Sequence, residues 1–295
     1  MECNSMRILF IFLLSVTPLI SCAAIGEEVA SNENDHVPVN HHHDHGHSTP
    51  HIDHSVQAFF TPEDLKEGNV IPTMFRGRYP SSSSPRLLPR EEADSIPFLH
   101  SKLPYLLHLF GFAQASARAN AVEETLRQCL IDKPIQGETK TCATSLESML
   151  DFVQQIFGSS TKFKALSTKT FAKSGTGSNI IQNYTITKEP RQVPSPKMVA
   201  CHTLPYPYVV YYCHHQESES KVFKVSLRGE VNNNIVEAIS VCHLDTSQWS
   251  PNHPSFQVLG LKPGSSPICH FFPADNLVWV PLFDTQDLGY KVLST

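Results

Sequence analysis

The stretch that decides the fold is residues 198–214, which reads MVACHTLPYPYVVYYCH. Its two ends, Met198 to Thr203 and Tyr208 to His214, are rich in apolar, β-branched and aromatic residues, and the prolines between them mark a turn. We therefore expect two β-strands here. The first strand carries the dipeptide Cys201-His202, and the second ends on the dipeptide Cys213-His214.

The same dipeptide recurs twice further along the chain, as Cys242-His243 and Cys269-His270, and Trp279 follows the last pair. Successive side chains of a strand point to opposite faces, so each pair sends its sulfur one way and its imidazole the other. We expect the four sulfurs to collect on one side and the four imidazoles on another. This arrangement predicts two disulfides together with a histidine site for a metal ion or a proton.

The first 23 residues are typical of a secretory signal peptide. Arg7 supplies a positive charge, Ile8 to Ile20 is an almost unbroken apolar run, and Ser21-Cys22-Ala23 offers small residues for cleavage. The run is too short to cross a bilayer comfortably, and no later stretch reaches the length needed. We expect a protein of the secretory pathway that is not held in a membrane once the signal is removed.

Signal removal leaves six cysteines in an oxidising compartment: Cys129, Cys142, Cys201, Cys213, Cys242 and Cys269. An even number favours three disulfides, although sequence alone leaves their connectivity open. Cys129 and Cys142 are close in sequence and separate from the Cys-His set, so we expect them to pair. For the other four cysteines we expect structural pairing, with thiolate metal ligands or free thiols as the alternatives.

Residues 24–58 form a histidine-rich segment with few large apolar residues and neither Tyr nor Trp. It holds eight of the 16 histidines: His36, His41, His42, His43, His45, His47, His51 and His54. Such a segment buries too little apolar surface to offset the entropy of ordering, which predicts a disordered arm. The arm is either a weak site for Cu(II), Zn(II) or Ni(II) that gains charge in acid, or a solvated linker.

Residues 59–295 are expected to form one folded domain that begins at Phe59-Phe60. Thr61 and Pro62 are typical of a helix start, so a short helix through Lys66 is predicted. Apolar residues at helical spacing predict a second helix over Ala119 to Leu130. A capping-box pattern at Thr144 to Glu147 predicts a third helix, which ends at Gly158.

The pattern then changes to the alternation of β-strands. Lys221 to Leu227 alternates cleanly, with Phe223, Val225 and Leu227 on one face, and Asn234 to Leu244 and Asn276 to Val280 are similar. The predicted fold class is therefore α+β, with N-terminal helices followed by a largely antiparallel β-sheet region that carries the four Cys-His pairs.

Several functional classes are excluded by composition and motif. The net charge of -5 gives no basic face for nucleic acid. The chain has no glycine-rich phosphate loop, no serine nucleophile elbow and no zincin helix. Asn183-Tyr184-Thr185 is an acceptor sequence for N-glycosylation in a secreted chain.

The four Cys-His pairs with Trp279, preceded by Phe59-Phe60 and by Cys129 and Cys142, resemble the BURP domain of plant secreted proteins. The resemblance covers roughly residues 58–295, and the short arm is similar to that of the seed-protein-like (unknown seed protein-like) subgroup. It implies a plant source. It also implies a family that mixes non-catalytic proteins of wall, seed, anther or stress response with copper-dependent peptide cyclases.

The resemblance implies that His202, His214, His243 and His270 are the candidate copper ligands, and it assigns no catalytic residue. Hydrogen bonding within a disulfide-rich core is the alternative role for these imidazoles. His215 is either a spare ligand or an exposed neighbour.

The first functional hypothesis is a non-enzymatic role in seed or reproductive development or in the stress response, with cell-wall components as partners. The second is a copper-dependent cyclase that crosslinks Tyr or Trp of a separate peptide, because the arm contains neither residue. The expected location is the apoplast or cell wall, or alternatively the storage vacuole.

Overall fold

The computed structural model of the protein describes residues 58–75, 85–171 and 180–282. The predicted signal peptide, almost all of the histidine-rich arm and the last 13 residues lie outside these ranges. So does the serine run that begins at Ser81.

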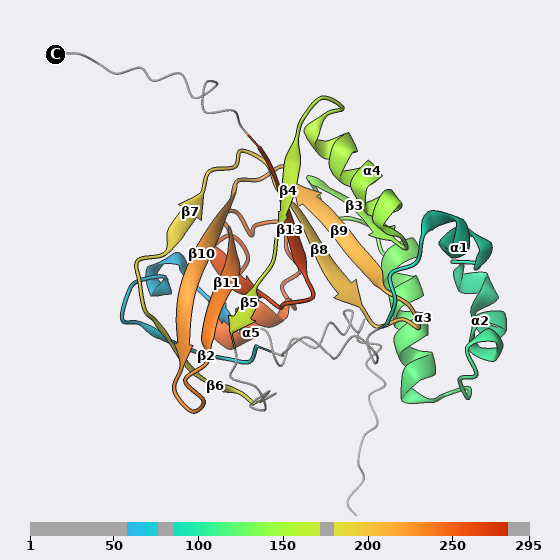
Figure 1. Ribbon diagram of the computed structural model, residues 1–295, viewed down its shortest axis with the longest axis horizontal. Helices are drawn as coiled ribbons and strands as arrows, with labels where there is room; N and C mark the ends of the chain where they lie inside the picture. The colour runs from blue at the N-terminus through green and yellow to red at the C-terminus, as the bar shows by residue number, and fades with distance from the viewer. Residues whose placement is uncertain (1–57, 76–84, 172–179, 283–295) are drawn as a thin grey trace, which may run out of the picture. The chain divides into compact units, whose positions relative to one another are not determined.

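The larger of two β-sheets is antiparallel throughout and has the strand order β1-β12-β11-β10-β6-β2, with β5 also paired to β11 and β7 to β10 (Figure 1). Its strands are β1 (Phe59–Phe60), β2 (Val70–Thr73), β5 (Lys169–Phe171), β6 (Gln182–Ile186), β7 (Arg191–Val193), β10 (Ser220–Gly229), β11 (Ile235–His243) and β12 (Ile268–Phe272). In β10, the side chains of Phe223, Val225 and Leu227 pack into one hydrophobic cluster, as their alternation predicts.

The smaller sheet is also antiparallel and has the order β3-β9-β8-β13-β4. Its strands are β3 (Glu138–Ala143), β4 (Phe163–Leu166), β8 (Val199–Leu204), β9 (Val210–Gln216) and β13 (Leu277–Pro281). The strands β8 and β9 are those expected from the stretch 198–214, and Pro205 and Pro207 lie in the turn between them.

The α-helices of the described residues are α1 (Arg90–Ser95), α2 (Leu103–Leu109), α3 (Ala117–Leu130), α4 (Leu146–Phe157) and α5 (Pro254–Leu259). The first three pack on one another around Leu106 and Leu126, which are fully buried. The fourth covers the outer face of the smaller sheet (Figure 1). Met149 and Val153 of this helix belong to one buried cluster with Val199 of β8.

The two sheets pack against each other through a shared apolar layer. Ala200 and Val278 of the smaller sheet meet Val222, Val241 and Phe272 of the larger sheet in one buried cluster. Burial of such apolar surface is the dominant stabilising contribution, about 25 cal/mol per Å² removed from water.

The helix starts agree with the predicted patterns only approximately. The capping box expected at Thr144 is displaced by one residue, because the side chain of Ser145 accepts from the backbone N–H of Ser148 at 3.1 Å and Ser148 reciprocates. The short helix after Thr61 is a 3₁₀ turn that covers only Pro62–Asp64. A serine hydroxyl can accept from the same backbone N–H groups as a carboxylate, so Ser145 and Ser148 can replace a Thr/Glu pair.

The predicted order of elements is wrong, although the sheets are largely antiparallel as expected. Strands β1 and β2 precede all the described α-helices, β3 lies between α3 and α4, and α5 follows β11. The early strands are too short to give a periodic signal, and they are stabilised by pairing with β12 and β6, more than 100 residues away.

Candidate functional site

The four histidines of the Cys-His pairs lie in one pocket of about 380 Å³. The pocket is lined by Phe59, Gln128, Asp132, Lys133, Ile135, Glu138, Lys140, His202, Tyr212, His214, Gln216, His243, Trp249, Ser250, His253, Pro254 and His270. Its volume is within the usual range for small-molecule and cofactor sites. The imidazoles come from both sheets and are therefore brought together by tertiary structure.

Strand register explains why the histidines of the first two Cys-His pairs face the same side of the smaller sheet. Cys201 and Cys213 lie directly opposite each other in β8 and β9 and form a disulfide. His214 is opposite Ala200, which belongs to the apolar layer between the sheets. Residues that lie opposite each other in neighbouring strands share a face, so His214 faces the same layer as Ala200. His202 is two residues after Ala200 in the same strand, so its side chain faces this layer too.

The other two pairs repeat this arrangement in the larger sheet. Cys242 and Cys269 lie opposite each other in β11 and β12 and form a disulfide. His270 is opposite Val241, so its ring also faces the layer between the sheets. The two strand pairs thus point four imidazoles toward one another.

The sulfurs do not collect on one side as the sequence predicts. The Cys201–Cys213 bridge lies in the cluster beneath α4, whereas Cys242 and Cys269 lie in a separate cluster with Phe60. The reason is that the two sheets face each other, so the sides away from the imidazoles are the two outer faces. Cys129 is bonded to Cys142, the pairing expected from the sequence, and this bridge joins the end of α3 to β3.

The rings are close but not in contact as a set of ligands. The ring centroids of His202 and His214 are 5.4 Å apart, those of His202 and His270 are 6.0 Å apart, and those of His243 and His270 are 5.6 Å apart. Phe272, which is fully buried, packs against His202 at 4.8 Å and against His270 at 5.0 Å. An apolar ring therefore supports the imidazoles on one side.

Each of the four rings has a polar group beside its Nδ1 atom. Nδ1 of His202 lies 3.0 Å from Nδ2 of Asn276, and Nδ1 of His214 lies 3.0 Å from Oε1 of Glu138. Nδ1 of His243 lies 3.3 Å from the Ser220 hydroxyl, and Nδ1 of His270 lies 3.4 Å from the carbonyl oxygen of Phe271. Orientation of one ring nitrogen by a neighbouring group is the usual second layer of a histidine metal site.

Burial keeps His243 neutral. Its side chain is almost fully buried, which lowers its pKa well below the ordinary value, and the nearby rings of His270, His214 and His253 lower it further. A neutral imidazole retains the lone pair that a metal ion requires. His243 is therefore ready to act as a ligand at neutral pH.

Glu138 is a buried carboxylate at the centre of a small polar network. Burial by itself raises its pKa, but contact with His214 and the bonds from the Ile135 N–H and the Tyr212 hydroxyl outweigh this effect and lower the pKa overall. The His214 contact is close at 3.0 Å, although its angle lies outside hydrogen-bond limits. Burial and the adjacent carboxylate raise the pKa of Tyr212, so its hydroxyl stays protonated.

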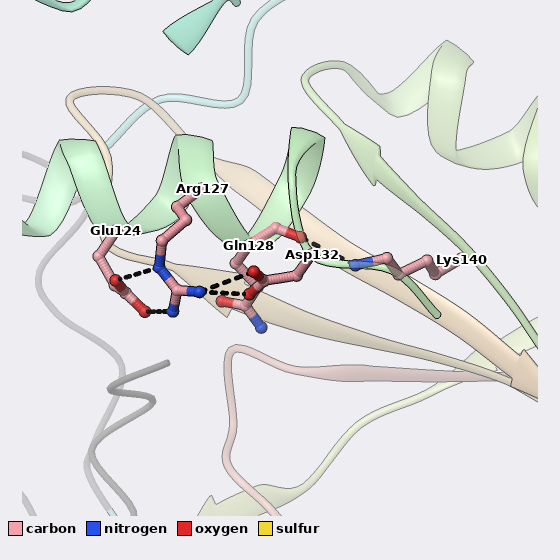
Figure 2. Close-up of polar contacts among 5 residues, drawn as sticks. All are labelled: Glu124, Arg127, Gln128, Asp132 and Lys140. Atoms are coloured by element: carbon pink, nitrogen blue, oxygen red, sulfur yellow. Dashed lines mark hydrogen bonds and ion pairs between the residues drawn. The ribbon is translucent and has the colours of Figure 1, made fainter. Parts of the chain in front are cut away.

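Gln128, Asp132 and Lys140 line one wall of the pocket, and polar contacts join them to their neighbours (Figure 2). Arg127 of α3 donates to both oxygens of Asp132, at 2.6 and 2.9 Å, and to both oxygens of Glu124, at 2.6 and 3.0 Å. Lys140 of β3 donates to the carbonyl oxygen of Gln128 at 2.9 Å. These bonds tie the end of α3 to the strand that carries Glu138.

The pocket contains the type of side chain that copper prefers as a ligand. Imidazole nitrogens are good copper ligands, and both sulfur pairs are oxidised, so the imidazoles are the candidate donors of the Cys-His motifs. Within the described part of the chain, however, no group of three His, Cys, Asp or Glu side chains stands close enough to hold one ion. The rings would have to move toward one another to share a single metal.

Most of the other pocket residues, including the aromatic ones beside the histidines, were missed by sequence reasoning. Trp249 lies against His243, with ring centroids 5.1 Å apart, and His253 lies against Trp249 at 4.6 Å. Phe59, expected only as the start of the domain, lies against His270 at 6.3 Å. The sequence indicates the Trp249 side of the pocket only by the presence of a Trp and a His within 11 residues of Cys242-His243.

Other predicted residues lie elsewhere. Trp279 packs on the outer face of the smaller sheet with Phe163, at 5.6 Å. His215 is directed away from the pocket lining and binds the Met198 carbonyl through Nδ1 at 2.8 Å; burial lowers its pKa. Asn183 is an exposed residue of β6. The eight arm histidines lie outside the described residues.

Comparison with known proteins identifies the family. The pattern that defines the BURP domain matches residues 58–281. The chain belongs to the BURP domain family. It is 39% identical to the BURP domain-containing protein BNM2C of Brassica napus over 92% of this chain and 95% of that protein.

Further BURP relatives include proteins of other plants. Identity is 42% to the BURP domain protein USPL1 of Arabidopsis thaliana, over 77% of this chain and 80% of that protein. Protein RAFTIN 1A of Triticum aestivum is 38% identical over 76% of this chain and 56% of its own length. Within the described ranges, none of the helices has the length and apolar character needed to cross a bilayer.

Proposed function

We propose that this chain is a secreted BURP protein whose histidine pocket binds copper and accepts a segment of a separate peptide. The observation that carries the proposal is the convergence of His202, His214, His243 and His270 on one pocket from two different sheets. A purely structural role for the imidazoles does not require four of them to line the same space. The function that this geometry supports best is oxidative crosslinking of an aromatic side chain.

The reaction removes two hydrogens from the peptide, one from a Tyr or Trp side chain and one from the atom to which that ring becomes bonded. Two electrons and two protons pass to dioxygen, which leaves as hydrogen peroxide. Copper, when bound, supplies the one-electron oxidation of the aromatic ring. The remaining tasks are binding, orientation and proton transfer, and these fall to the residues of the pocket.

The side chains around the histidines suit such a substrate. Phe59, Trp249 and His253 supply aromatic surface on which a peptide ring can pack edge-to-face or offset. Glu138 is held ionised by its neighbours and orients His214. The peptide would enter over the polar wall formed by the end of α3 and by Lys140.

The experiment is incubation of the secreted full-length protein with Cu(II) in air and a set of synthetic peptides that each contain one Tyr or Trp. Mass spectrometry of the peptides is expected to find a loss of two hydrogens located at the aromatic residue. His214→Ala is expected to abolish the loss, whereas His215→Ala, outside the pocket, is the matched control. A copper-loaded wild-type protein that leaves every peptide mass unchanged would contradict the catalytic proposal.

A non-enzymatic role is the second candidate, and one observation favours it. The imidazoles as placed do not form a group that holds one ion, and Asn276 and Glu138 already engage two of them. In this case the protein would act in seed or reproductive tissue, in stress, or as a wall or vacuolar component. Elemental analysis separates the candidates, because a purified protein without stoichiometric copper after copper exposure supports only this second role.

The proposal of secretion is supported by the signal-like first 23 residues and by three disulfides. It predicts a glycan on Asn183, whose exposed amide donates to Oε2 of Glu230 at 2.9 Å and would give up this bond. Expression in plant cells and glycosidase digestion should give a mobility shift that Asn183→Gln removes. Recovery of the protein in wall washes or in isolated vacuoles distinguishes the two destinations.

A further inference from the structure

The three disulfides differ in how well solvent reaches them. Both cysteines of the Cys201–Cys213 bridge and both of the Cys242–Cys269 bridge are fully buried. Cys129 and Cys142 are only partly buried, at the border of the helix cluster. Thiol–disulfide exchange requires direct attack of a thiolate on a disulfide sulfur, so access decides which bridge reacts. The Cys129–Cys142 bridge is therefore the one that a reductant can reach in the folded protein.

The chain between these two cysteines forms a wall of the histidine pocket. We call residues 129–142 the wall segment. Six pocket residues lie in this segment or directly before it: Gln128, Asp132, Lys133, Ile135, Glu138 and Lys140. Five of the six lie between Cys129 and Cys142, and Gln128 is the residue before Cys129. The exposed disulfide therefore closes the loop that supplies this wall.

The two halves of the wall segment are held with unequal strength. From Glu138 onward the chain is strand β3, which pairs with β9 along its whole length. Residues 131–137 form neither helix nor strand. Among the described residues, the hydrogen bonds of residues 131–136 reach no further than Arg127 on one side and Glu138 on the other. This half of the wall therefore depends on its two ends for a fixed position.

Those ends are tied together at two points. The Cys129–Cys142 bond joins the end of α3 to β3, and Nζ of Lys140 donates to the carbonyl oxygen of Gln128 at 2.9 Å (Figure 2). Without the disulfide, the Lys140 hydrogen bond would be the remaining direct tie between these ends. Opening of such a segment is a local event that leaves the rest of the fold intact.

We propose that the Cys129–Cys142 disulfide is a redox modification site that controls the pocket: a dithiol reduces it in the folded protein, and the released wall segment loses its fixed position beside the histidines. A peptide would then have to order residues 131–136 as it binds, which costs conformational entropy and lowers its affinity. The effect on peptide affinity rests on the proposed function, whereas the selective reduction and the release of the wall do not.

The modification is a balanced thiol–disulfide exchange. A thiolate of the dithiol attacks one sulfur of the bridge, the S–S bond breaks, and the other cysteine leaves as a thiolate. The second thiol of the reductant then displaces the first cysteine from the mixed disulfide. The reductant ends as a disulfide and both cysteines end as thiols, so two electrons and two protons pass to the protein. A disulfide reagent of the same class reverses the reaction.

The first test compares the three bridges and needs neither copper nor peptide. The full-length secreted protein is equilibrated with increasing dithiothreitol at neutral pH, alkylated with iodoacetamide and mapped by mass spectrometry. Alkylation of Cys129 and Cys142 is expected at concentrations at which the other four cysteines stay oxidised and the near-ultraviolet circular dichroism is retained. Earlier reduction of another bridge, or loss of all three in one step, would overturn the proposal.

The second test asks whether the bridge holds the wall. In the selectively reduced and alkylated protein, amide hydrogen exchange of residues 131–136 should be faster by about 10-fold or more, with little change in β9 and β12. The double variant Cys129→Ser with Cys142→Ser should show the same fast exchange and no response to dithiothreitol. Unchanged exchange in the reduced protein would show that the disulfide does not control the wall.

The third test measures the effect on the pocket. Fluorescence anisotropy of labelled Tyr and Trp peptides, recorded without copper, is expected to find binding that is about 10-fold weaker after selective reduction and that recovers on reoxidation. Equal affinity in the two states would contradict control of the pocket. A protein that binds no peptide in either state would defeat the proposed function, and the hydrogen-exchange result would then decide the release of the wall by itself.

Discussion

The β8–β9 and β11–β12 strand pairs contain the same arrangement of one disulfide and two histidines, but different groups contact the histidines in the two pairs. In each pair two cysteines lie opposite each other and form a disulfide, and the two adjacent histidines face the layer between the sheets. The first pair is anchored by side chains with a definite polarity, the Asn276 amide and the Glu138 carboxylate. The second is anchored by a hydroxyl and a backbone carbonyl.

This difference teaches that one dipeptide motif can give imidazoles of different chemistry. The disulfide and the strand alternation determine only that each ring faces the pocket. The group that meets Nδ1 determines whether the ring presents a lone pair or a hydrogen. Removal of the disulfides should therefore have its main effect on stability. Substitution of the groups that contact Nδ1 should have its main effect on metal binding.

The largest effect is expected from removal of the disulfides. Replacement of Cys242 and Cys269 by Ala opens a connection of 27 residues, and replacement of Cys201 and Cys213 opens one of 12. Loop-closure entropy predicts losses in free energy of unfolding of about 3.5 kcal/mol for the first and about 3 kcal/mol for the second. Urea unfolding of the two double variants measures these losses. A larger loss for the β8–β9 bridge, by 1 kcal/mol or more, would mean that core packing beneath α4 outweighs loop length.

The next effect concerns the anchor of the β8–β9 pair. Glu138→Gln removes the charge beside His214, and loss of such a second-layer carboxylate typically weakens metal affinity by about 10- to 100-fold. Competition with a coloured chelator measures the Cu(II) affinity. Glu237→Gln is the control, because Glu237 binds Ser226 in the larger sheet away from the histidines. A similar loss in both variants would contradict a specific role for Glu138.

A smaller effect is expected from the anchor of the β11–β12 pair. Ser220→Ala removes a neutral contact of 3.3 Å to His243, which is worth at most about 1 kcal/mol, or a factor of about five in Cu(II) affinity. The same chelator titration applies. If Ser220→Ala weakens binding as much as Glu138→Gln, the charge of the anchor is not what distinguishes the two pairs.

The smallest perturbation is spectroscopic. The chain has two tryptophans; Trp249 lies in the pocket against His243, whereas Trp279 lies on the outer face of the smaller sheet. Cu(II) quenches nearby fluorophores, so copper should quench most of the Trp249 emission and less of the Trp279 emission. Trp279→Phe should keep the quenching and Trp249→Phe should lose most of it. The reverse pattern would place the metal outside the pocket.

Much of the strand content could be predicted, because alternation along a strand is a local property. Residues 198–214 form two strands with a proline turn, and Phe223, Val225 and Leu227 share one face as expected. The early strands and the helices α1 and α2 were not predicted. Strand β1 is only two residues long and is stabilised by pairing with β12, so no local sequence pattern predicts it.

The candidate site was predicted only in part. The four histidines were named from their dipeptides, but Glu138, Asn276 and Trp249 carry no motif. Asn276 is 74 residues from His202 along the chain, and Glu138 is 76 residues from His214. Contacts of this kind depend on which strands become neighbours, and single-sequence periodicity contains no such information.

The amino-acid sequence by itself determined that each Cys-His pair separates its sulfur from its imidazole, because a strand has a period of two residues. It also determined the family to which the chain belongs. Only the tertiary structure decided that the four imidazoles line one pocket while the two disulfides lie in separate hydrophobic clusters. The physical reason is that two sheets bury their apolar faces against each other, which turns one face of every pair inward and the other outward.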